Sequence, residues 1–82
     1  MITYEVDGYF KTQLITHEKE FDIESLRYMY QEALNYIEYK HGSITEVADI
    51  LCGMFGFKLT DTHDDPMYTI DTDTDLVIYH DR

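Results

Sequence analysis

The first sixteen residues alternate between apolar and polar side chains with the period of a β-strand. An Asp-Gly pair between two such runs is a strong signal for a tight turn, so residues 2–16 are predicted to form a β-hairpin around Asp7 and Gly8. A two-residue turn would place Phe10 and Leu14 on the face opposite Tyr4, and a bulge at Gly8 would correct this mismatch. The register therefore stays open.

Residues 22–41 have the apolar spacing of an amphipathic helix. Asp22 is a favourable N-cap, and Gly42 is predicted to end the helix as a C-cap glycine. A second helix is predicted to begin at Ser43, because Glu46 completes a capping box three residues later. Gly53 and Gly56 end or loosen it. The predicted buried face of this second helix comprises Ile44, Val47, Ala48, Leu51, Met54 and Phe55.

The last third of the chain is rich in strand-forming residues. Residues 57–60, 67–70 and 76–79 are predicted strands, and the acidic segment 71–75 is either a tight turn or the middle of one long strand. The chain is thus expected to form one acidic α+β domain over residues 1–82. We expect a small antiparallel sheet of four to five strands, in the order β-β-α-α-β-β, with both helices packed on one face.

Composition adds a strong charge signal to this fold. Seventeen acidic and six basic residues give a formal net charge of −11, and residues 61–82 hold seven of these acids but only one base, Arg82. An apolar content of 44% argues against a disordered acidic tail. This charge disfavours direct binding to nucleic acid or to anionic lipid and favours a basic partner.

The acids near the C-terminus are the first candidate site. In an extended strand, Asp71, Asp73 and Asp75 would project from one face about 7 Å apart, close to the spacing of successive phosphates. With neighbouring acids they could imitate a nucleic-acid backbone, whereas the simpler interpretation is a solvated loop that discourages edge pairing. The acidic candidate residues are Asp61, Asp64, Asp65, Asp71, Asp73 and Asp75.

The second candidate site is the outward face of the first helix. Tyr28, Glu32 and Tyr39 lie opposite the apolar stripe, and Tyr36 lies at its flank. Tyrosine is common in protein interfaces because its ring adds apolar area and its hydroxyl can form hydrogen bonds. This face predicts either a homodimer contact or a partner surface, unless other parts of the chain cover the rings.

No catalytic, cofactor or metal site is predicted. The acids at 71, 73 and 75 match the first three ligand positions of an EF-hand, but Leu76 stands where glycine is needed, so Ca²⁺ binding is left open. An enzyme or a metal sensor would require His63, Asp64 and Asp65 to converge with another histidine. Acidic neighbours of Cys52 would raise the pKa of its thiol, which disfavours a nucleophile.

In size, acidity and aromatic content the chain resembles the small acidic inhibitors of bacteriophages and mobile elements. That resemblance implies a nucleic-acid mimic whose partner is a basic nucleic-acid-binding protein, such as a nucleoid protein, a nuclease, a CRISPR effector or a polymerase. The alternative is an acidic adaptor that binds a protein through the tyrosine face. One cysteine and the absence of a signal-peptide pattern favour a reducing, cytoplasmic location, the host cytoplasm for a phage protein.

Overall fold

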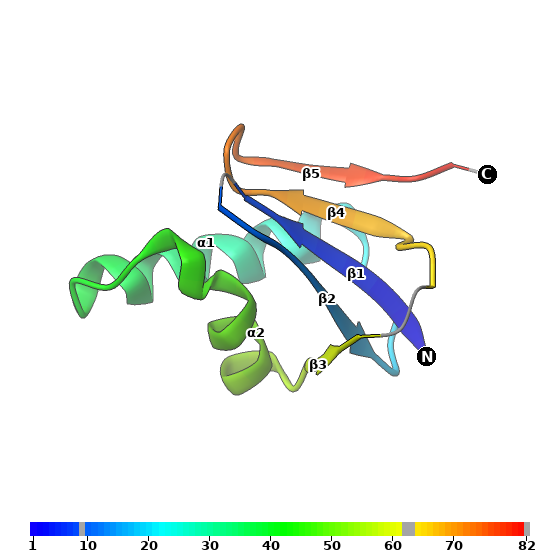
Figure 1. Cartoon of the computed structure of the whole chain (residues 1–82), viewed down its shortest axis with the longest axis horizontal. Helices are drawn as coiled ribbons and strands as arrows, with labels where there is room; N and C mark the ends of the chain where they lie inside the picture. Colours follow the sequence, from blue (N-terminus) through cyan, green and yellow to red (C-terminus); the bar gives the residue numbers. More distant parts are fainter. Residues whose placement is uncertain (9, 62–63, 82) are drawn as a thin grey trace.

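The structure, a computed structural model, describes residues 1–8, 10–61 and 64–81. In these residues, five strands form one sheet in the order β3-β2-β1-β4-β5 (Figure 1). The strands span β1 (Ile2–Asp7), β2 (Thr12–His17), β3 (Lys58–Thr60), β4 (Tyr68–Asp71) and β5 (Leu76–Tyr79). The predicted α+β class is therefore confirmed.

The sequence predicted a wholly antiparallel sheet, but the sheet is mixed. β1 pairs in parallel with β4, while its other neighbour, β2, is antiparallel to it. The parallel pair arises because the chain leaves β3 at one edge and re-enters the sheet on the far side of β1, which is a crossover connection. This pairing brings Tyr4 beside Tyr68 and Val6 beside Ile70 at the centre of the sheet.

The first hairpin has a longer loop than the Asp7–Gly8 turn predicted. Tyr4 pairs with Ile15 and Asp7 pairs with Thr12, so residues 8–11 form the connection. The Gly8 amide donates a hydrogen bond to the Lys11 carbonyl across it. In this register Tyr4 and Ile15 share the core face, and Leu14 lies opposite Glu5 on the other face.

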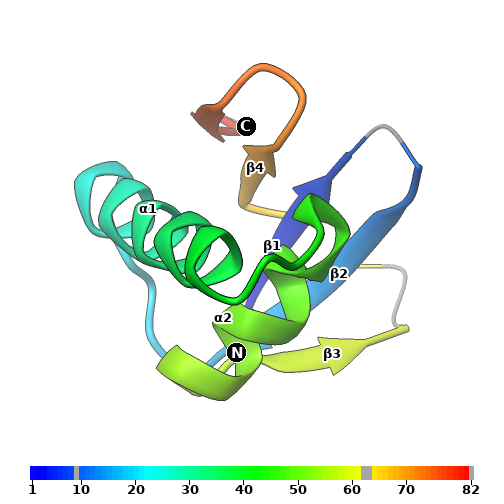
Figure 2. The same cartoon turned by 90° about the vertical axis from the view of Figure 1, so that its left-hand side faces the viewer.

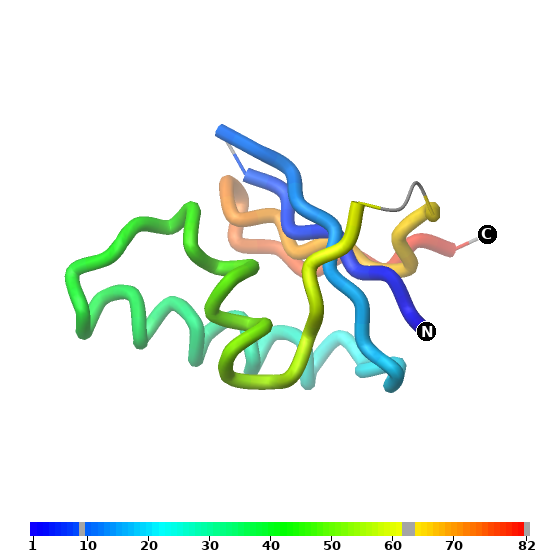
Figure 3. The backbone as a smooth tube through the Cα atoms, turned by 60° about the horizontal axis from the view of Figure 1, so that its bottom comes forward, coloured from blue at the N-terminus to red at the C-terminus, as the bar shows by residue number. Residues whose placement is uncertain are grey.

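The helices form as their caps predicted. The Asp22 side chain accepts a hydrogen bond from the Ser25 amide and caps α1 (Ile23–Tyr39). The predicted capping box is present at Ser43 and Glu46, but its first turn is a 3-10 turn (Ile44–Glu46) that leads into α2 (Val47–Phe55). Figure 3 shows the chain reversing between α1 and α2 and then running into β3 beside β2.

One of the two helix ends differs from the prediction. At the end of α1 the left-handed residue is His41, with φ of 56°, rather than Gly42. The Gly42 amide donates to the Ile37 carbonyl and the His41 amide to that of Glu38, which is a Schellman motif. Gly56, with φ of 79°, ends α2 as predicted.

Both helices lie on one face of the sheet, with α1 beside β5 and α2 against β2 and β3 (Figure 2). The predicted stripe of α1 supplies much of the core, but Ile44 and Met54, predicted to be buried, are exposed. The fully buried side chains come from β1, β2, β4 and both helices: Tyr4, Ile15, Leu26, Ala33, Val47, Ala48, Leu51 and Ile70. The other face of the sheet, which we call the open face, lacks a helix among the described residues.

Candidate functional site

The acidic segment between β4 and β5 is a turn, not a strand. β4 ends at Asp71 and β5 begins at Leu76. The Asp73 amide donates a hydrogen bond of 3.0 Å to the Asp71 carboxylate, and Asp75 has a left-handed φ of 58°. The strand alternative, and with it the phosphate-like spacing of these three acids, is therefore excluded.

One of these acids is already bound within the fold. The Tyr30 hydroxyl on α1 donates a hydrogen bond of 2.5 Å to the Asp75 carboxylate. Burial and this hydrogen bond raise the pKa of the Tyr30 phenol well above its usual range. Asp75 therefore fixes the β4–β5 turn to α1, in addition to adding charge.

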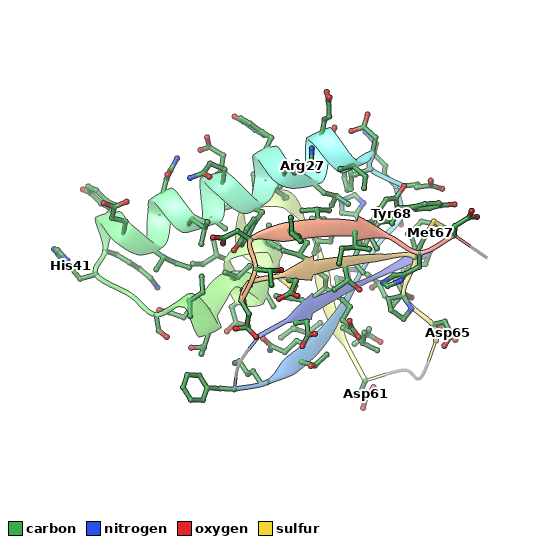
Figure 4. All side chains as sticks on the ribbon, turned by 90° about the horizontal axis from the view of Figure 1, so that it is seen from above. Arg27, His41, Asp61, Asp65, Met67 and Tyr68 are labelled. Atoms are coloured by element: carbon green, nitrogen blue, oxygen red, sulfur yellow. The ribbon has the colours of Figure 1, made fainter. Side chains whose placement is uncertain are left out.

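The predicted acids do not form one continuous group. Asp71, Asp73 and Asp75 lie at the end of β4, whereas Asp61, Asp64 and Asp65 lie in the connection that precedes it. Figure 4 shows Asp65 near the other end of β4, on the side of Met67, whereas Asp61 lies apart from it, directly after β3 at the opposite edge of the sheet. Asp65 and Asp71 are thus separated by the length of β4, and Asp61 is separated from both by the width of the sheet.

The structure instead brings two of the predicted acids together with two acids of β1 that the sequence analysis did not select. Glu5 and Asp7 alternate with the buried Tyr4 and Val6, so their side chains lie on the open face. The parallel register places Asp71 beside Asp7. We call Glu5, Asp7, Asp65 and Asp71 the acidic row. The alternation of β1 was readable in the sequence, but the position of β4 beside β1 was not.

Asp65 joins this row at a shallow pocket beside β1. Glu5, Asp65, Pro66 and His80 line the pocket. Thr69 connects two of these residues: its hydroxyl donates a hydrogen bond of 3.1 Å to the Glu5 carboxylate, and its oxygen lies 2.5 Å from His80 Nε2. The Thr69 hydroxyl therefore holds Glu5 and His80 in place on the open face.

This pocket meets part of the condition set for a metal site. Asp65 and a second histidine, His80, line the same pocket, but His63 lies outside the described residues. Across residues 1–8, 10–61 and 64–81, no group of three histidine, cysteine or acidic side chains is arranged to hold a metal ion. Burial and the charge of Asp49 raise the pKa of the Cys52 thiol, in the direction that the sequence predicted.

The tyrosine surface, defined as Tyr28, Glu32, Tyr36 and Tyr39, lies on α1 away from the core. Tyr39 is 86% exposed and Tyr28 is 62% exposed, so nothing in the described chain covers these two rings. Tyr36 is less free, because the Lys40 ammonium lies 5.5 Å from its ring centre. Tyr28 and Tyr39 are therefore the members most available to a partner.

Few of the acids are neutralised by other described residues. Between described residues the structure shows one ion pair, in which the Lys40 ammonium lies 2.6 Å from the Glu46 carboxylate. The excess of negative charge is thus presented to solvent. Among the same residues, no helix is long and apolar enough to cross a membrane.

Comparison of the chain with protein-family models, with curated proteins and with solved structures gives no significant match.

Proposed function

We propose that this chain is a non-enzymatic acidic binding protein that occupies the nucleic-acid-binding surface of a basic protein. The observation that carries the proposal is the acidic row on the open face. Carboxylates of Glu5 and Asp7 project about 7 Å apart along β1, and those of Asp71 and Asp65 extend the row at its sides. Lys and Arg side chains that normally hold phosphates would pair with these carboxylates.

The net charge supports the same proposal. A formal charge of −11 would accelerate the encounter with a basic surface and would prevent direct binding to nucleic acid. A free cysteine, Cys52, fits a reducing compartment such as the cytoplasm, where we place the protein. Bacterial nucleoid proteins, nucleases, CRISPR effectors and polymerases are the partner classes to test first.

The test uses proteins that a bacterial lysate deposits on beads carrying double-stranded DNA. The full chain is added at 0.1 M salt, where the Debye length is about 10 Å. It should release specific basic proteins from the beads. Each released protein, once purified, should lose fluorescently labelled DNA when the chain is added. The proposal fails if no DNA-binding protein is released, or if the chain binds such a protein and the DNA stays bound.

A pair of triple variants separates placed carboxylates from bulk charge. Glu5→Gln with Asp7→Asn and Asp71→Asn removes three charges from the acidic row, and the amides can still accept the hydrogen bonds. The matched control removes three exposed charges elsewhere, through Glu18→Gln, Glu38→Gln and Asp49→Asn. We expect the first variant to displace DNA at least about tenfold less well than the control, since a charge-assisted hydrogen bond contributes about 1.5–3 kcal/mol. Equal losses would show that bulk charge alone drives binding.

The exposed rings of Tyr28 and Tyr39 favour a second candidate, an adaptor that binds a protein through α1. Under this function the charge would serve solubility. The two functions differ in the residues that matter. Replacing Tyr28 and Tyr39 with serine should abolish adaptor binding, whereas displacement of DNA by the acidic row should persist.

A further inference from the structure

The last strand, β5, forms one edge of the sheet. β4 is its one strand neighbour within the described chain, and Figures 1 and 2 show α1 beneath the sheet rather than along this edge. An edge strand presents backbone N–H and C=O groups that lack a ladder partner, and it can accept a further strand. The direction of these groups decides what β5 can bind.

The hydrogen bonds of the ladder fix that direction. The His80 amide donates a hydrogen bond of 2.9 Å to the Met67 carbonyl, so the backbone groups of His80 point toward β4. Because hydrogen-bonded residues alternate along an antiparallel strand, Ile78 also points its backbone groups toward β4. The N–H and C=O groups of Val77 and Tyr79 therefore point away from the sheet, where a new strand would lie.

The side chains of β5 suit an added strand. Leu76 and Ile78 are 52% and 41% exposed on the open face, and Tyr79 is also exposed. Residues 76–79 contain no charge and no proline, which are the usual devices that prevent pairing at an edge. The opposite edge strand, β3, has both a shorter span and a charged residue, Lys58.

The charges around β5 specify the kind of strand. Exposed Asp73 precedes the strand, and exposed Asp81 follows it. An extended segment with aliphatic residues at its centre and Lys or Arg at both ends would place its cations beside these carboxylates. A segment with acidic ends would meet like charges and be rejected.

Two antiparallel registers of β5 with a second copy of this chain bring acidic residues opposite each other. Antiparallel pairing of two β5 strands centred on Val77 would place Asp81 of one copy opposite Asp73 of the other. A pairing centred on Ile78 would place Asp81 opposite Asp75 instead. Like charges directly opposite each other destabilise a strand pair, and each copy already carries −11.

We propose that β5 is the docking edge for an extended, basic-ended segment of the partner protein, which adds to the sheet as a sixth strand. This inference rests on the proposed function for the basic character of the partner. It adds a mode of recognition that the acidic row does not provide, namely main-chain hydrogen bonds to Val77 and Tyr79.

The first test compares peptides that differ either in the sign of their charge or in their ability to pair as a strand. The probe is the peptide acetyl-Lys-Lys-Thr-Val-Thr-Val-Lys-Lys-amide, added to the full chain. One control has Glu in place of every Lys, and another keeps every Lys but carries N-methyl groups at alternate central residues, so that it cannot pair. We expect the first peptide alone to slow amide exchange at Val77 and Tyr79, by about tenfold or more. Equal effects of the two lysine peptides would reduce the binding to charge attraction and overturn the proposal.

The second test uses two variants at one position. Tyr79→Pro removes an outward N–H and keeps the ladder bonds to β4, whereas Tyr79→Val loses the same ring but keeps the N–H. We expect Tyr79→Pro to bind the lysine peptide about tenfold more weakly than Tyr79→Val. Equal affinities of two folded variants, or a wild-type dimer whose Val77 and Tyr79 amides are already protected, would overturn the proposal. If circular dichroism shows that Tyr79→Pro is unfolded, the peptide comparison on the wild-type chain decides.

Failure of this proposal and failure of the proposed function give different results. If the chain displaces DNA and Tyr79→Pro does so as well as Tyr79→Val, the edge proposal fails alone. If the lysine peptide protects Val77 and Tyr79 but no DNA-binding protein is displaced, the proposed function fails and the edge proposal holds.

Discussion

Two single residues with left-handed backbone conformations lie where the chain changes direction. His41 and Asp75 both adopt left-handed backbone conformations, His41 at the end of α1 and Asp75 before β5. Asp75 has compensation, because Tyr30 binds its carboxylate and aspartate tolerates this conformation better than most residues. His41 projects from the far end of α1 in Figure 4, away from the sheet.

The first prediction concerns His41. His41→Gly should raise the free energy of unfolding by about 0.5 kcal/mol. Glycine removes the cost of the left-handed conformation, about 1–2 kcal/mol. It also gives the unfolded chain more conformational freedom, which lowers the free energy of unfolding by about 0.4–1 kcal/mol. The midpoint of urea unfolding measures this change. His41→Ala removes the imidazole and keeps the Cβ atom, so this control should show no gain. A gain of equal size in both variants would assign the effect to the imidazole rather than to the backbone.

At the scale of elements, α1 has two faces with separate roles. Leu26, Ala33 and Ile37 bury one face against the sheet and α2. Tyr28 and Tyr39 are eleven residues apart, about three helical turns, and lie on the same line of the other face. An exposed pair of rings on a long helix is a candidate seam for a homodimer.

The second prediction tests that seam. Light scattering at high protein concentration should show a dimer for the wild-type chain and a monomer for Tyr28→Glu with Tyr39→Glu, because the new carboxylates would be buried in the contact. The variant should keep its helical circular dichroism spectrum, since its core stripe is unchanged. The matched control, Tyr28→Phe with Tyr39→Phe, keeps the rings and should remain dimeric. A monomeric wild-type chain would refute the seam.

At the scale of the whole molecule, buried tyrosine hydroxyls make the stability of the fold depend on pH in the alkaline range. The Tyr4 hydroxyl donates to the Lys19 carbonyl and accepts from the Phe21 amide, so it joins β1 to the loop before α1. Burial of the Tyr68 hydroxyl is the larger cause, and its hydrogen bond to the Glu20 carboxylate the smaller one, of a rise in the pKa of Tyr68 to about 12. Burial also raises the pKa values of Tyr4 and Tyr30. All three phenols thus hold their protons more tightly in the folded chain than in the unfolded chain.

The third prediction follows from this difference. The stabilisation is complete below the unfolded tyrosine pKa of about 10, and it is lost as pH rises toward the folded pKa values, because only the unfolded chain then releases these protons. The free energy of unfolding should therefore fall between pH 10 and pH 12, by at most about 1.4 kcal/mol per pH unit for each phenol. Urea unfolding at a series of pH values measures the slope.

Tyr68→Phe provides the control for that slope. Tyr68→Phe removes one buried phenol, so the free energy of unfolding should fall less steeply above pH 10 than in the wild-type chain. Tyr28→Phe changes an exposed ring and should leave that slope nearly unchanged. Parallel curves for the wild-type chain and Tyr68→Phe would contradict the role assigned to Tyr68.

The sequence by itself determined the elements whose signals are local. Asp22 and the Ser43–Glu46 pair marked both helix starts, and alternation marked β1, because caps and periodicity depend on residues a few positions apart. Only the tertiary structure decided which acids share a face. The contact of Glu5 with Thr69 spans 64 positions, and it exists because β4 crosses over to pair in parallel with β1. Strand order depends on the burial of Tyr4, Val6, Tyr68 and Ile70 in one core, so no local pattern could place Glu5 and Asp7 beside Asp71 or leave the edge of β5 open.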